Sequence, residues 1–141
     1  MLTIKRLDIA DAERLIASAR AKARQIGVPM CIAVTDESGN LIAFERMDGG
    51  KITSIQLAID KSFTATGIRK GTDALGEVNQ PGMPAHGIAS ALGGRMVAVA
   101  GGLPVMSGGV VVGGIGVSSG SPAQDLEVAQ AGAEAFDNTP T

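Results

Sequence analysis

The chain has 141 residues, of which 45% are hydrophobic, and it carries a formal net charge of −2. This composition excludes a disordered chain, and the slight negative charge argues against nucleic acid or an anionic membrane surface as a partner. The length predicts a single domain, residues 1–141, that buries its own core without disulfides or metal.

The composition also limits the chemistry of the chain. Cys31 is the only cysteine, which excludes an internal disulfide and any Cys-x-x-Cys motif. The first residues lack the apolar core of a secretory signal, and no apolar run approaches the roughly 18 residues of a membrane span. We therefore expect a cytoplasmic protein. With Phe44, Phe63 and Phe136 as its only aromatic residues, it would hold a flat ligand mainly by aliphatic groups, methionine and glycine backbone.

The chain begins with the pattern of a helix followed by a β-hairpin. Apolar residues recur at helical spacing over 9–26, and Gly27 and Pro29 end that helix. Two apolar runs, 30–36 and 41–47, flank a Ser-Gly-Asn turn and predict two strands. Because the first run is apolar on both faces, we expect a central strand covered by helices on one face and by another subunit on the other.

A second helix is predicted after the hairpin. Thr53 and Gln56 have the spacing of a capping box, so this helix begins near Ser54. It ends near Gly67 or Gly71. Residues 72–94 have the weakest periodicity, and a segment of this length in a compact domain indicates a binding segment or lid.

The last third of the chain predicts three strands and a closing helix. The strands are expected at 95–100, 103–106 and 110–117, and a helix-start signature follows at Ser121, Pro122 and Gln124. The order of elements implies an α+β fold with five strands in a mainly antiparallel sheet. Glycines are dense in this third, which indicates a backbone that a ligand or second chain approaches closely; the alternative is that each glycine fits a tight turn.

His86 is the only histidine and lies in a Pro-Gly-rich loop. Its imidazole is the best iron ligand or general base that the chain offers, and the alternative is a solvent-exposed loop histidine. Met83 adds a thioether three residues away, although packing is the simpler role for it. Since no second histidine or cysteine stands near, a metal would have to be shared across a symmetry axis.

Arg46 and Lys61 form a candidate cationic pair for a carboxylate, because arginine offers a planar fork for that group. The alternative is structural, with ion pairs between Arg46 and Asp48 or between Asp60 and Lys61. The amides of Gly101 and Gly102 could form an anion-binding concavity. Serines 118, 119 and 121 lack a paired histidine and acid, so helix capping is their expected role.

Several blocks, each weak alone, occur in a specific order. They are IAVTD at 32–36, RMD at 46–48, AIDKS at 58–62, GGLP at 101–104, GGIGVS at 113–118 and QD at 124–125. Together, from about residue 5 to residue 136, they resemble the GlcG/HbpS-like (DUF336) family. The resemblance implies a five-stranded antiparallel sheet with flanking helices, profilin-like or PAS-like, assembled into homo-oligomers. Family members include haem-binding and haem-degrading proteins, the C-terminal domain of PduO-type corrinoid adenosyltransferases, and proteins encoded beside catabolic pathways.

Two functions follow as hypotheses. The first is a small-molecule-binding protein whose ligand is haem or a related tetrapyrrole, with His86 on the iron. Its predicted binding residues are Arg46, Asp48, Lys61, Met83, His86, Gly101 and Gly102. The second is a catabolic enzyme, an isomerase, lyase or hydrolase of a small oxo or hydroxy acid, in which Arg46 anchors the carboxylate while His86 or Lys61 moves a proton.

Overall fold

A computed structural model describes residues 1–137; residues 138–141 of the predicted domain lie outside the described part. The helices and strands alternate along the chain in an α+β order. They are α1 (Ile9–Ile26), β1 (Cys31–Asp36), β2 (Leu41–Arg46), α2 (Thr53–Ile68), α3 (Thr72–Val78), the 3-10 turns η1 (Ile88–Ser90) and η2 (Leu92–Gly94), β3 (Gly102–Ser107), β4 (Val110–Ser118) and α4 (Pro122–Asp137).

The strands of residues 1–137 form one antiparallel sheet in the order β2-β1-β4-β3. The α+β class is confirmed, but the prediction of five strands is wrong because 95–100 is not a strand. Thr64 of α2 explains the difference: its hydroxyl donates to the carbonyl of Arg95 and accepts from the amide of Val97, both at 3.0 Å. This segment satisfies its backbone against a helix instead of a neighbouring strand.

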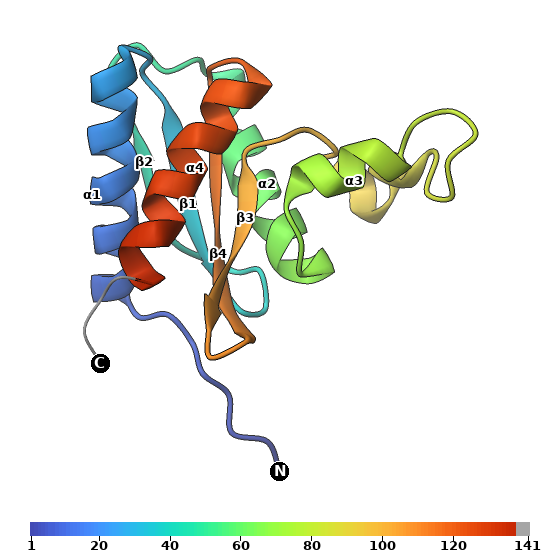
Figure 1. Ribbon diagram of the computed structural model, residues 1–141, viewed down its shortest axis with the longest axis horizontal. Coiled ribbons are helices and arrows are strands. Elements are labelled where there is room, and N and C mark those ends of the chain that lie inside the picture. The colour runs from blue at the N-terminus through green and yellow to red at the C-terminus, as the bar shows by residue number, and fades with distance from the viewer. Residues whose placement is uncertain (138–141) are drawn as a thin grey trace.

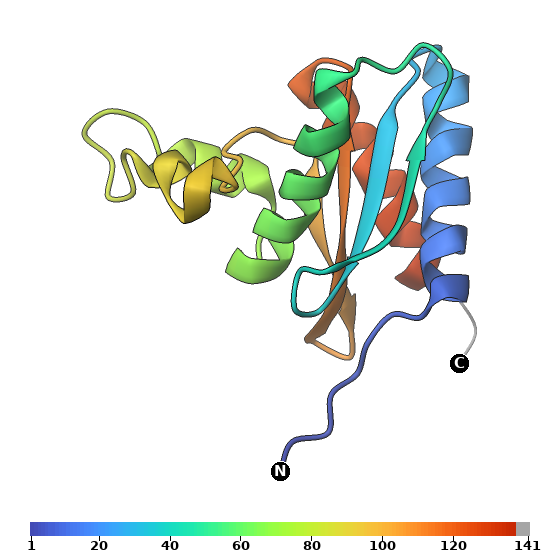
Figure 2. The ribbon, with the colours of Figure 1, turned by 180° about the vertical axis from the view of Figure 1, so that it is seen from behind.

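The sheet lies between helices on both faces (Figures 1 and 2), with α1 and α4 on one face and α2 on the other. As predicted, β1 is central and buried along its whole length. Ile32 and Val34 join the core shared with α1 and α4, whereas Cys31 and Ala33 pack beneath α2. The second face is therefore covered by the chain's own helix, and the expectation of another subunit there is wrong.

Glycines on β4 allow α2 to lie unusually close to the sheet. A Cβ at Gly116 would stand 2.0 Å from the carbonyl oxygen of Ala58, and one at Gly114 would stand 2.9 Å from that of Ser62. No side chain fits in such a space. The close approach that the glycine pattern predicted is thus made within the chain, by α2.

The predicted start of α4 is confirmed, whereas that of α2 is only partly right. Ser121 Oγ accepts from the amide of Gln124 at 3.2 Å, and the Gln124 side chain accepts from the amide of Ser121 at 2.9 Å. No such box forms at Thr53, which is the first residue of α2 and is preceded by Ile52 in a helical conformation. Gln56 is unavailable for capping because its amide group donates to Asp60 one turn later.

We expect Ser121→Ala to lower the free energy of unfolding by about 1 kcal/mol, because the amide of Gln124 loses its acceptor. Urea denaturation followed by circular dichroism measures this change. Ser121→Asp, which keeps an acceptor at the cap, is the control and should stay close to the wild type. An equal loss in both variants would show that the cap does not stabilise α4.

Residues 69–100 form an arm that projects sideways from the layered body (Figures 1 and 2). The sequence predicted an irregular segment over 72–94 and missed α3. At the base of the arm, Arg95 stacks on the ring of Phe63 at 3.8 Å and donates to Asp60 at 3.0 Å. Arg95 therefore ties the segment that returns from the arm to α2.

Across residues 1–137, the helices are all too short or too polar to cross a membrane.

Candidate functional site

A cavity of about 260 Å³ opens where α2 and α4 begin. Figures 1 and 2 show the first turns of these helices side by side at one end of the sheet. We call this cavity the Lys61 pocket. It is lined by polar side chains from α2 and from the end of β4, and by apolar side chains from the arm: Lys51, Thr53, Ser54, Leu57, Lys61, Val97, Val99, Ser118, Ser119, Gly120, Pro122 and Asp125.

A buried ion pair lies in the Lys61 pocket. Lys61 Nζ is 2.9 Å from Asp125 Oδ2 and 3.0 Å from the carbonyl oxygen of Val117, and the two charged residues are only 2% and 3% exposed. Asp125 Oδ1 also accepts from the amide of Gly120 at 2.9 Å. An ammonium at this depth requires such partners, because an unpaired buried charge is strongly destabilising.

Asp125 was not among the site residues predicted from the sequence. Asp125 belongs to the QD block in the first turn of the predicted closing helix. That block does not indicate that Asp125 pairs with Lys61, 64 residues earlier. The predicted alternative pair of Asp60 and Lys61 is wrong, since Asp60 pairs with Arg95 instead.

Gly101 and Gly102 lie against Lys61. A Cβ on Gly101 would be 2.9 Å from Lys61 Nζ, and one on Gly102 would be 2.4 Å from the carbonyl oxygen of Lys61. Both glycines are buried, and the amide of Gly102 donates to Thr72 Oγ1 at 2.9 Å. Because these two residues have no side chains, Lys61 fits beside them. The amide of Gly102 is already hydrogen-bonded to Thr72, so it is not available to bind an anion.

Arg46 and Asp48 line a different cavity, of about 440 Å³, together with Arg20, Arg24, Glu45 and Met47. The structure therefore separates Arg46 from Lys61, the two cations that the sequence suggested as one carboxylate clamp. The alternative ion pair between Arg46 and Asp48 is not formed either. Among residues 1–137, Arg46 has no ion-pair partner.

His86 and Met83 lie on the arm and are both exposed, Met83 by 44%. The amide of His86 donates to the carbonyl of Met83 at 3.2 Å, which brings the two residues into one turn. Neither residue lines the Lys61 pocket. In the described part of the chain, no group of three or more histidine, cysteine and acidic residues could hold a metal ion.

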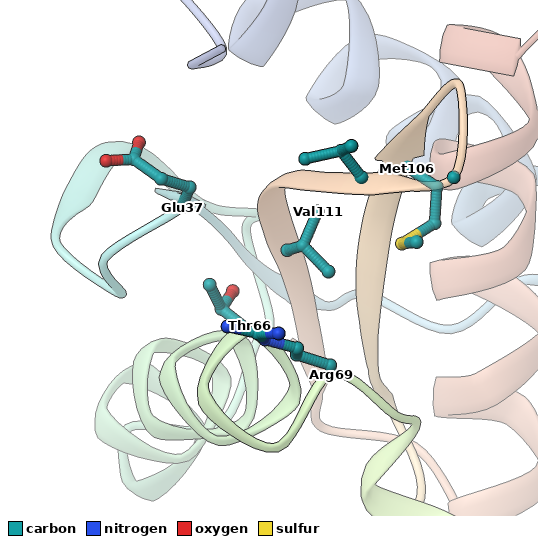
Figure 3. Close-up of a pocket in the computed structure, with 7 residues that line it drawn as sticks. Glu37, Thr66, Arg69, Met106 and Val111 are labelled. Atoms are coloured by element: carbon teal, nitrogen blue, oxygen red, sulfur yellow. The ribbon is translucent and has the colours of Figure 1, made fainter. Parts of the chain in front are cut away.

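A third cavity, of about 300 Å³, lies beside the β3–β4 hairpin (Figure 3). Thr66 and Arg69 from the end of α2 face Met106 and Val111 across it, and Glu37 stands at its edge. Two hydrogen bonds from Arg6, at 2.7 and 2.6 Å, lower the pKa of Glu37 to about 2. This carboxylate is therefore already engaged by Arg6, outside the cavity.

Cys31 is fully buried, and burial raises the pKa of its thiol. Its Sγ lies 3.7 Å from the carbonyl oxygen of Lys51. A buried thiol that stays protonated is a poor nucleophile, so Cys31 has the properties of a core residue.

Two of the three serines assigned to helix capping have another role. Ser121 caps α4 as predicted, but Ser118 Oγ donates to Ser54 Oγ at 3.2 Å, and Ser119 Oγ accepts from the amide of Lys51 at 3.0 Å. Ser119 also has a φ of 121°, a strained conformation for a residue with a side chain. Only the tertiary structure reveals these roles, because Ser54 and Lys51 lie more than 60 residues earlier in the chain.

Comparison with known proteins agrees with this fold. A family model described as "Haem degrading protein HbpS-like" matches residues 7–134. The uncharacterized 15.0 kDa protein of the dhaT-dhaS intergenic region of Citrobacter freundii is 35% identical over 133 residues, which are 94% of each chain.

Two solved structures are also similar. Klebsiella pneumoniae protein ORFY, described as DUF336, aligns with a TM-score of 0.97 and 28% identity over 99% of this chain and 97% of its own. The structure described as a PduOC:Heme complex aligns with a TM-score of 0.89 and 33% identity over 92% of this chain and 94% of its own.

Proposed function

Since the chain belongs to the HbpS-like family, we propose that it is a small-molecule-binding protein whose ligand is haem or a related tetrapyrrole. The observation that carries this proposal is the similarity along 92% of the chain to the PduOC:Heme complex. A shared fold alone would be a weak argument, because one fold serves many functions. The proposal therefore depends on whether the residues of this chain suit a tetrapyrrole.

The arm offers the residues that suit haem. His86 is exposed, and its imidazole has no hydrogen-bonding partner within residues 1–137. Three large apolar side chains of the arm are also exposed, Met83 by 44%, Leu92 by 62% and Val99 by 46%. A histidine for the iron beside apolar groups for the ring is the combination that haem proteins use, and bound haem would supply its iron chemistry there.

The Lys61 pocket does not suit a tetrapyrrole. Drug-sized ligands occupy cavities of about 300–1,000 Å³, and a tetrapyrrole is large among them. The pocket measures about 260 Å³ and has charged walls. We therefore place the haem on the arm, with a second copy of the chain covering its other face, which makes the protein a homo-oligomer when loaded.

We expect a titration with haemin to give a saturable Soret shift, and His86→Ala to weaken the binding about tenfold or more by removing the iron ligand. Glu77→Ala, an exposed substitution on the same arm, is the matched control. Added imidazole should restore the wild-type spectrum to His86→Gly. Sedimentation velocity measured with and without haemin tests whether a second copy of the chain joins when haem binds, which would raise the sedimentation coefficient.

Two results would contradict this assignment. An absence of any saturable shift would remove haem as the ligand. A shift of equal strength in His86→Ala would place the iron ligand elsewhere in the chain.

A further inference from the structure

The Lys61 pocket contains more buried hydrogen-bond donors than the chain satisfies. Lys61 Nζ has three N–H groups, and two of them have acceptors, at Val117 and Asp125. Ser54 accepts from Ser118, and Ser119 accepts from the amide of Lys51, but neither hydroxyl has an acceptor for its own hydrogen within residues 1–137.

Depth makes this surplus significant. Lys61, Ser54 and Ser119 are 2%, 3% and 8% exposed, so bulk water does not satisfy them freely. Each of these three polar atoms has at least one partner, but each also carries a hydrogen that finds no acceptor within residues 1–137. Several such hydrogens lining one cavity indicate that a group bound there accepts them. Asp125 does not fill that role, because both of its oxygens already accept a hydrogen bond.

The charge of the Lys61 pocket also favours an anionic ligand. The lining holds Lys51 and Lys61 against a single acidic residue, Asp125, which gives a formal charge of +1. The exposed Lys51 stands at the surface, where it can meet an incoming anion. The lining also includes the apolar side chains of Leu57, Val97 and Val99.

We propose that the Lys61 pocket binds the carboxylate group of a short-chain organic acid, whose aliphatic part packs on Leu57, Val97 and Val99. A volume of about 260 Å³ limits the acid to a small one. The carboxylate accepts from Ser54, Ser119 and the free N–H of Lys61 through charge-assisted hydrogen bonds. Because Val97 and Val99 belong to the arm, the arm supplies one wall.

The backbone at Ser119 supports a binding role. Its φ of 121° is one that glycine adopts at lower cost, yet a serine occupies the position. Strained residues of this kind concentrate at functional sites, where the side chain is needed in spite of the strain. This assignment is independent of haem binding, since no residue of the loop 80–87 lines the pocket.

The test is a titration of the 15N-labelled full chain with sodium butyrate, followed by the amide shifts of residues 51–61 and 118–120. Butyramide, which has the same shape without the charge, is the matched ligand. We expect saturable shifts with butyrate and no binding of butyramide in the same concentration range.

Two variants identify the groups that hold the carboxylate. Ser119→Gly should weaken butyrate binding about tenfold, the effect of losing one hydrogen bond to a charged group. Lys51→Gln should weaken it about threefold, because it removes an exposed cation at the mouth of the pocket. Lys70→Gln, an exposed lysine outside the pocket, is the control and should bind like the wild type. Ser119→Gly should melt close to the wild type, because glycine relieves the strained φ while the amide of Lys51 loses its acceptor.

Absence of saturable shifts would mean that water alone fills the pocket and would overturn the proposal. Equal binding of butyrate and butyramide, or unchanged butyrate affinity in both Lys51→Gln and Ser119→Gly, would overturn it as well. None of these results bears on the haemin titration, so the two proposals fail separately.

Discussion

Gly116→Ala is expected to destabilise the protein by about 3 kcal/mol or more, at the upper end of what overpacking costs. The added Cβ would lie 2.0 Å from the carbonyl oxygen of Ala58 and 2.5 Å from the amide nitrogen of Ser62. Both atoms belong to the backbone of α2, so no side chain can turn away to make room. The helix itself must move away from the sheet, and this movement would loosen the close packing of the core residues between α2 and the sheet.

Differential scanning calorimetry measures this effect, and we expect a fall in the melting temperature of about 10 °C. Gly67→Ala is the matched control because Gly67 lies in α2 with nothing within 4 Å of the position of its Cβ. Alanine there should stabilise the helix by about 0.5–1 kcal/mol. If Gly116→Ala melts like the wild type, the close packing of α2 on β4 is not what holds this face.

Asp125→Ala is expected to cost about 3–5 kcal/mol, the range for breaking a buried ion pair from one side. The substitution leaves the ammonium of Lys61 buried without its carboxylate, and it also removes the acceptor for the amide of Gly120. Urea denaturation should show a lower midpoint with an unchanged slope.

Glu127→Ala provides the control on the same helix. Glu127 pairs with Lys22 at 3.1 Å, but its side chain is 48% exposed, so this substitution should change stability by about 0.5 kcal/mol or less. The double variant Lys61→Met and Asp125→Leu should recover most of the loss, because apolar side chains can replace a buried pair. A loss no larger than that of Glu127→Ala would show that Lys61 and Asp125 contribute little to stability.

These two predictions concern the residues on which the proposed carboxylate site is built. Gly116 lets α2 approach β4, and Asp125 fixes the ammonium of Lys61 at the depth of the pocket. Pairing with Asp125 occupies one N–H of Lys61 and leaves another for a ligand. The same contacts therefore stabilise the fold and orient the donors.

The sequence alone determined the elements that depend on local signals. The helical periodicity of 9–26, the two apolar runs around the Ser-Gly-Asn turn and the cap at Ser121 each involve residues that are close in the sequence. The apolar run of β1 also predicted a strand buried on both faces. The ordered blocks identified the family, because their sequence along the chain is itself a signal.

Tertiary structure decided what depends on distant residues. Segment 95–100 has the composition of a strand, but Thr64 of α2 takes its hydrogen bonds. Lys61 pairs with Asp125 of α4, a helix that begins 61 residues later in the chain. Arg46 lines a different cavity. Local propensity cannot predict such pairings, because they arise only when helices pack on the sheet and bring buried polar groups within reach of one another.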